Sequence, residues 1–161
     1  MKKSLLLIGL LLFTIQIFSQ AVPSKIKKAF KNQYPEAIDA NWRYDGDYKL
    51  REWKVLFKSE DVLHSSWYDY KGNWIQTKTK IDKSKLPEAV LKSIEEDYAS
   101  YKIVIVARFE NSDIDGYEVF LNNENIGGFD VQYTKAGKLY HRTMRSKGYK
   151  PLDDDGNVIE E

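Results

Sequence analysis

The chain has 161 residues, and its 42% hydrophobic and 14% aromatic content is enough for one packed domain and too high for a disordered chain. Its 25 basic and 24 acidic residues nearly cancel, which argues against nucleic acid as a partner, because phosphate binding needs clustered positive charge. The chain has no cysteine, so disulfides cannot stabilise it and its core alone must hold the fold.

The N-terminal segment is typical of a secretory signal. Lys2 and Lys3 precede an apolar run over residues 5–18, and Ser19 lies at a candidate cleavage site. The run is shorter than the roughly 20 residues that a membrane-spanning helix needs, which favours a cleaved signal over an anchor. We therefore expect a signal peptide over residues 1–19, a periplasmic or secreted mature chain, and no stable membrane insertion after cleavage.

A helical pattern follows and occurs twice in the chain. The copy that begins at Pro23 recurs at Pro87, which is 87 − 23 = 64 positions later. Proline suits the first turn of a helix, and Pro35 ends the first copy because the residue before a proline avoids the α region. Apolar residues spaced i, i+3, i+4, i+8 predict one buried stripe in each helix. The stripes are Ile26, Ala29, Phe30 and Tyr34 in the first copy, and Val90, Ser93, Ile94 and Tyr98 in the second.

Alternating patterns follow each helix and predict strands with one face on a core. The inward-facing residues are Trp53, Val55 and Phe57 in the first copy, and Tyr117, Val119 and Leu121 in the second. Other strands are expected at 37–44, 64–68 and 74–80, and at 102–109, 129–133 and 139–144. From Tyr68 onward the offset between copies is 65, so we place a one-residue length difference in the preceding hairpin, since a slip within a strand would turn every side chain over.

These elements predict an α+β chain, built as a tandem repeat of one helix plus about four antiparallel strands. We expect the first α+β repeat over residues 20–82 and the second over residues 83–146. Residues 147–161 are expected to form an acidic C-terminal tail, which is either mobile or a small peripheral hairpin.

The order of motifs also carries a resemblance. Val-Pro, an amphipathic helix, Tyr-Pro-x-Ala, a tryptophan, a Trp-x-Val-x-Phe strand and an aromatic-Asp-x-x-Gly turn are followed by Leu-Pro and a second round. The residues are Val22, Pro23, Tyr34, Pro35, Ala37, Trp42, Trp53, Val55, Phe57, Tyr68, Asp69, Gly72, Trp74, Leu86, Pro87, Tyr117, Val119 and Gly137. In the second copy Ala99 replaces the proline and Thr134 the turn aspartate. This order resembles the PepSY-like family of exported bacterial proteins, which has the β-lactamase-inhibitor-protein-like fold.

The resemblance implies a periplasmic binding or inhibitory role through the sheet face, and it implies no reaction. The residues themselves show no catalytic, metal or cofactor motif. His64 and His141 lack the spacing of zinc ligands, and no phosphate-binding loop or Gly-x-Ser-x-Gly motif is present. We expect no enzyme activity, no metal and no cofactor. An envelope structural protein, or a hydrolase with a site assembled from scattered acids, stays open as an alternative.

The sheet face opposite the helices is the candidate binding surface. Strand alternation places Lys54, Leu56 and Trp67 on it in the first repeat, and Glu118, Phe120 and Gln132 in the second. Trp74 extends this patch if its strand keeps the same phase. Because aromatic anchors supply most interface energy, we expect exposed Trp67 and Phe120 to bind a protein or peptide. A second core layer, or self-association that buries this face, is the alternative.

Overall fold

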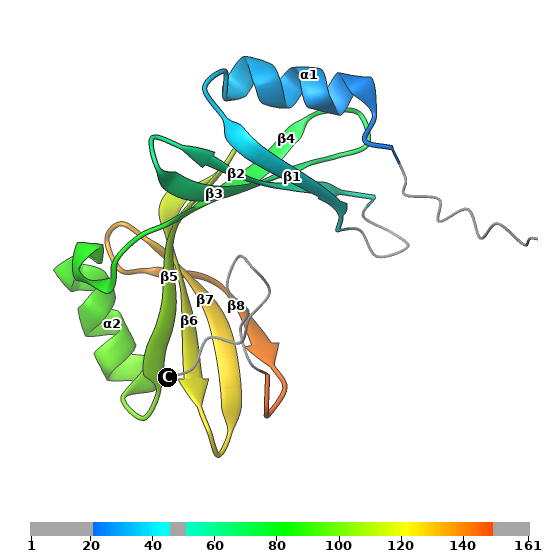
Figure 1. Ribbon diagram of the computed structural model, residues 1–161. Coiled ribbons are helices and arrows are strands. Elements are labelled where there is room, and N and C mark those ends of the chain that lie inside the picture. Colours follow the sequence, from blue (N-terminus) through cyan, green and yellow to red (C-terminus); the bar gives the residue numbers. More distant parts are fainter. Residues whose placement is uncertain (1–20, 46–50, 150–161) are drawn as a thin grey trace, which may run out of the picture.

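The computed structural model describes residues 21–45 and 51–149 (Figure 1). The expected signal peptide and residues 150–161 of the expected acidic tail lie outside the described residues. The first half contains α1 (Ser24–Gln33), β1 (Ile38–Tyr44), β2 (Trp53–Ser59), β3 (Val62–Tyr68) and β4 (Trp74–Lys80). A short 3-10 helix (Lys83–Lys85) leads to α2 (Glu88–Tyr98), β5 (Lys102–Asn111), β6 (Asp115–Asn123), β7 (Gly127–Thr134) and β8 (Leu139–Arg145).

All the strands of the two halves belong to one antiparallel sheet, in the order β1 to β8. The two halves are joined in its middle, where β4 pairs with β5 from Gln76–Asn111 to Lys80–Ala107. Figure 1 shows that the sheet bends near this junction, with α1 over β1–β4 and α2 beside β5–β8, both on the outer side of the bend. We call the opposite side of the sheet the concave face. The predicted α+β tandem repeat is confirmed.

The one-residue difference between the repeats lies in a hairpin, as predicted. The β2–β3 turn consists of Glu60 and Asp61, which both have positive φ, as in the tight turns that match the twist of paired strands. The β6–β7 turn has three residues, 124–126. Equivalent pairs on either side of the turns, such as Val55 with Ser66 and Val119 with Val131, keep their register.

Each repeat has its own hydrophobic cluster between its helix and its half of the sheet. The first consists of Ile26, Phe30, Trp53, Val55, Phe57 and Tyr68. The second consists of Leu86, Val90, Ile94, Tyr98, Val106, Val119, Leu121, Val131 and Tyr133. Most of both helix stripes and of the predicted inward-facing strand residues are therefore in the core. The half-buried exceptions are Ala29, Tyr34, Ser93 and Tyr117. Burial of such side chains contributes roughly 1.5–3 kcal/mol each.

Candidate functional site

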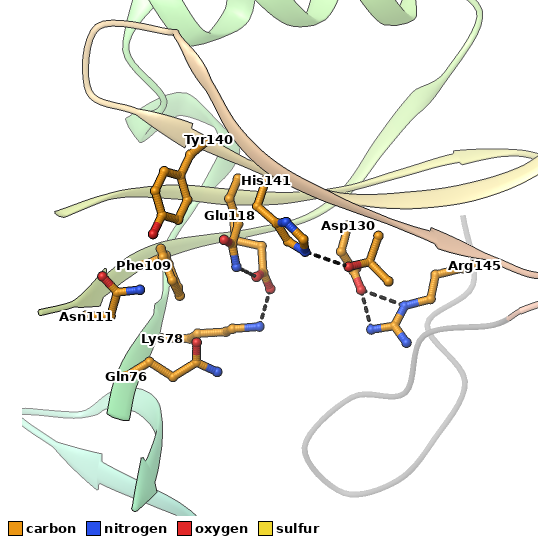
Figure 2. Close-up of a pocket in the computed structure, with 11 residues that line it drawn as sticks. Gln76, Lys78, Phe109, Asn111, Glu118, Asp130, Tyr140, His141 and Arg145 are labelled. Atoms are coloured by element: carbon orange, nitrogen blue, oxygen red, sulfur yellow. Dashed lines mark hydrogen bonds and ion pairs between the residues drawn. The ribbon is translucent and has the colours of Figure 1, made fainter. Parts of the chain in front are cut away.

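The concave face carries an open hollow of about 630 Å³ over β4 to β8 (Figure 2). Residues two apart along a strand point to the same face of the sheet, so residues of neighbouring strands come together to line this hollow. Register aligns Lys78 with Phe109 and Glu118 with Gln132. The lining residues used below are Gln76, Lys78, Phe109, Glu118, Asp130, Gln132, Tyr140, His141 and Arg145. The hollow is therefore polar and charged, with one buried ring, Phe109, among its lining residues.

Two ion pairs neutralise the carboxylates of the hollow. The Lys78 ammonium lies 2.5 Å from one Glu118 oxygen, and the Gln132 amide donates to the other oxygen at 2.8 Å. Arg145 Nε donates to Asp130 Oδ2 at 2.6 Å. The first pair joins β4 to β6, two strands apart in the sheet, and the second joins the neighbouring strands β7 and β8 (Figure 2), so the charges of the hollow cancel locally.

Asp130 is the titratable group that the hollow perturbs most clearly. Burial raises the pKa of the Asp130 carboxyl, and the nearby negative charge of Glu118 raises it further, while Arg145 opposes the rise. Glu118 and Asp130 are diagonal neighbours on one face, because Glu118 pairs with Gln132 and Phe120 with Asp130. The hydrolase alternative needs two convergent carboxylates, yet each of these is bound to its own cation.

Trp67 lies on the concave face, but the prediction that it is exposed is wrong. Its side chain is only 7% exposed. The ammonium groups of Lys54 and Lys78 lie 4.7 and 5.3 Å from the ring centroid, and the indole N–H donates to Asp45 at 2.6 Å. The long lysine side chains cover an aromatic ring that would otherwise face water. Lys54 and Leu56 are themselves half-buried on the same face.

Phe120 is also buried, contrary to the prediction, and it is 4% exposed. Its ring lies against Gly128 of the neighbouring strand, and the ring of Tyr149 lies edge-on at 5.4 Å. Tyr149 belongs to residues 147–161, which we expected to form an acidic C-terminal tail. At Tyr149 this segment contacts the sheet.

Trp74 does not extend the concave patch. The β3–β4 pairing is irregular, because Trp67 pairs with Gln76 and the next residue, Tyr68, pairs with Trp74. The extra residue, Ile75, reverses the phase of the strand. Trp74 therefore packs against the first core cluster, where its indole N–H donates to Thr77 at 2.9 Å.

Comparison with known families and structures agrees with this architecture. The family model described as "Putative beta-lactamase-inhibitor-like, PepSY-like" matches residues 14–51 and 51–141. The chain belongs to this PepSY-like family. A search of curated proteins found no match to it.

Solved structures show the same fold for this PepSY-like chain. A BLIP-like protein from Bacteroides fragilis is 22% identical, with a TM-score of 0.65 over 80% of this chain and 90% of that one. A DUF2874 family protein from Bacteroides uniformis is 18% identical, with a TM-score of 0.68 over 84% and 99%. A protein from Bacteroides eggerthii described as "putative periplasmic" is 15% identical, with a TM-score of 0.64 over 77% and 89%. In the described part of this chain, neither helix is of a length and hydropathy that could span a bilayer.

The sequence did not reveal most of the residues that line the hollow in this PepSY-like chain. Gln76, Tyr140 and His141 come from β4 and β8, whose phase was not assigned in advance. The His141 Nε2 atom lies 3.2 Å from the Thr143 hydroxyl, whereas His64 stacks on Phe57 beside the first core. No group of three or more histidine and acidic side chains in residues 21–45 and 51–149 is arranged to hold a metal ion.

Proposed function

We propose that this PepSY-like chain is an exported, non-catalytic module that binds a segment of a protein or peptide on its concave face. The observation that carries the proposal is the hollow over β4 to β8, on the side of the sheet that neither helix covers. Its volume of about 630 Å³ lies within the range of ligand sites in proteins. The inhibitor-like description of the family fits a protein that acts by binding.

The chemistry of the hollow supports a peptide-like ligand. Tyr140, which is 44% exposed, offers an aromatic ring and a hydroxyl, and tyrosine is enriched at protein interfaces. Gln76 adds an amide that can donate to and accept from a peptide backbone. The paired carboxylates keep further acceptor positions, so a bound segment can hydrogen-bond to them without breaking either ion pair.

The ion pairs also support a non-catalytic role. Glu118 is bound to Lys78 and Gln132, and Asp130 is bound to Arg145, so neither carboxylate is free to pair with the other as an acid and a base. Asp130 is the residue on which a hydrolase would depend, because burial raises its pKa. Replacement of Asp130 by asparagine should therefore leave partner binding largely intact, whereas an enzyme would lose its turnover.

A photo-crosslinking experiment tests the binding face. A benzophenone amino acid is placed at Tyr140 or, as a matched control, at Leu139, which is 43% exposed and pairs with Tyr133 on the helix side of the sheet. Both versions of the exported chain are irradiated in periplasmic extract. We expect a discrete adduct from position 140 and none from position 139. Equal adducts from both positions, or none, would contradict the proposal, and an adduct of twice the chain mass would indicate self-association instead.

A substitution then measures the contribution of the hollow. Tyr140→Ala should weaken binding of the captured partner by at least about tenfold, as truncation of an aromatic anchor commonly does. Leu139→Ala should leave the affinity within about twofold. Both variants should melt near the wild-type temperature, because both side chains are exposed.

A further inference from the structure

Phe120 forms the base of a second feature of the concave face, next to the hollow. Its ring lies close against β7 because residue 128 is a glycine: a Cβ atom there would lie 2.7 Å from the Phe120 ring. The strand register places Phe120 directly opposite Asp130, one of the residues lining the hollow. The outward side of the Phe120 ring is therefore a prepared apolar surface at the margin of a charged hollow.

Tyr149 occupies this surface. Its ring lies edge-to-face on Phe120, with centroids 5.4 Å apart and an interplanar angle of 74°. The guanidinium of Arg145 lies 5.1 Å from the centroid of the same ring, and Asp130 fixes that guanidinium from the other side. The Tyr149 ring therefore makes an edge-to-face contact with one aromatic ring and a cation–π contact with a guanidinium. Both contacts are electrostatically favourable for an aromatic ring.

Within residues 21–45 and 51–149, the contacts that hold Tyr149 in place are few. Its side chain is 39% exposed, and its turn after β8 is closed by one backbone hydrogen bond, from the Tyr149 N–H to the Ser146 carbonyl at 3.0 Å. Gly148, the residue before it, has a φ of +81° and open space around it. Segments with so few contacts open at low free-energy cost. The site on Phe120 is thus built into the sheet, whereas its present occupant is easily exchanged.

We infer that Phe120, Gly128 and Arg145 form an aromatic-binding subsite, which takes a tyrosine or phenylalanine side chain of a bound segment in place of Tyr149. The inference rests on the proposed function and adds the chemistry of the partner: an extended segment with an aromatic residue. Arg145 and Asp130 contribute both to this subsite and to the hollow, so the aromatic side chain lies beside the part of the segment that occupies the hollow.

Defined probes test the subsite without any cellular partner. The mature chain with Tyr149→Ala has the site empty, and its amide NMR spectrum is followed during titration with the capped tripeptides Gly-Tyr-Gly and Gly-Leu-Gly. We expect saturable shifts at Phe120, Gly128 and Arg145 with the tyrosine peptide and not with the leucine peptide. The chain that keeps Tyr149 should bind the tyrosine peptide about tenfold more weakly, because its own side chain competes.

Two further variants control the comparison. Tyr149→Phe keeps a ring in the site and should bind the tyrosine peptide as weakly as the wild type, while sharing with Tyr149→Ala the loss of the hydroxyl. Phe120→Leu combined with Tyr149→Ala should abolish the localised shifts. Equal binding of the leucine and tyrosine peptides, or no saturable shift in the Tyr149→Ala chain, would overturn the inference. Failure of the crosslinking experiment would leave these peptide results unchanged, so the two proposals fail separately.

Discussion

The two repeats have the same backbone plan and differ in how their cores are filled. In the first repeat, Phe30 of α1 contacts the rings of Tyr34, Trp42, Phe57 and Tyr68. At the positions equivalent to Phe30, Trp42 and Phe57, the second repeat has Ile94, Val106 and Leu121. The first core is therefore aromatic and the second mainly aliphatic.

The hydrogen bonding of buried hydroxyl groups also differs between the two repeats. In the first repeat, Thr77 Oγ1 is within hydrogen-bond distance of Tyr34, Ser66 and Trp74, at 2.7, 3.0 and 2.9 Å. The Tyr68 hydroxyl donates to Gln33 at 2.9 Å. In the second repeat, Val131 replaces Ser66 and Asp97 replaces Gln33. The Tyr133 hydroxyl, equivalent to that of Tyr68, is buried and has no hydrogen-bond partner among the described residues.

The two cores show that the fold depends on the positions of the apolar residues more than on whether they are aromatic or aliphatic. A hydrogen-bonded aromatic core and an aliphatic core support the same helix-on-sheet packing, as expected when the apolar pattern is kept. The second repeat is destabilised at one position, Tyr133, because a buried hydroxyl without a hydrogen-bond partner costs the free energy of its desolvation.

The largest effect is expected from truncating the central helix residue of each core. Phe30→Ala should lower the free energy of unfolding by about 3–5 kcal/mol, because it removes a ring that contacts four others. Ile94→Ala should cost about 2–4 kcal/mol, since it leaves a smaller cavity. Urea unfolding of both variants, with exposed Lys28→Ala as a control, measures the difference. A larger cost at Ile94 would mean that the aliphatic core is the more tightly packed of the two.

The next effect concerns equivalent positions on the concave face, Trp67 and Gln132. Trp67→Ala should cost about 3 kcal/mol, because the ring is buried between Lys54 and Lys78. Gln132→Ala should cost about 1.5 kcal/mol, because it removes one hydrogen bond to a sheltered carboxylate. Thermal melts of the two variants measure this difference. An unchanged melting temperature for Trp67→Ala would mean that the Trp67 ring is exposed, as the sequence predicted.

Smaller effects, of opposite sign to each other, are expected when the hydroxyl groups of the equivalent residues Tyr68 and Tyr133 are removed. Tyr68→Phe should destabilise by about 1 kcal/mol, because it breaks the hydrogen bond to Gln33. Tyr133→Phe should stabilise by about 1 kcal/mol, because it removes a buried hydroxyl that lacks a partner. Differential scanning calorimetry should show melting temperatures that move in opposite directions. A destabilised Tyr133→Phe variant would show that the hydroxyl has a partner in solution.

The smallest effect concerns pH and belongs to the second repeat, where Asp130 occupies the position of Ser65 in the first. Burial raises the pKa of Asp130 in the folded chain, so folding favours its protonated form. The free energy of unfolding of the wild type, relative to Asp130→Asn, should therefore rise as pH falls through the folded-state pKa. It should level off below the unfolded value of about 3.9. A relative stability that falls with acidification would mean that the Arg145 ion pair outweighs burial.

Much of the fold could be predicted because it depends on local periodicity. The helix stripe of Ile26 and Phe30 and the strand phase of Val55 follow from residues close in sequence, and the 64-residue offset follows from the internal repeat. The candidate site could not be predicted in the same way. Trp67 and Phe120 were placed on the correct face, but Lys78 and Tyr149, which cover them, lie on later elements, 78 − 67 = 11 and 149 − 120 = 29 residues further along the chain. Trp74 was misplaced because one irregular residue pairing reversed its phase, and no sequence pattern marked it.

The strand β8 is the counterpart of β4, so its outer edge bears on how a further repeat can be added to the chain and on pairing between molecules. In the first repeat the outer edge of β4 accepts β5, whereas β8 pairs with β7 alone among the strands described here. The same edge could in geometric terms receive a third repeat, so duplication of this unit extends a sheet instead of adding a separate domain. An open edge is also a template for unwanted pairing between molecules. Arg142 places positive charge on β8, and two such charges would repel each other when two edges meet.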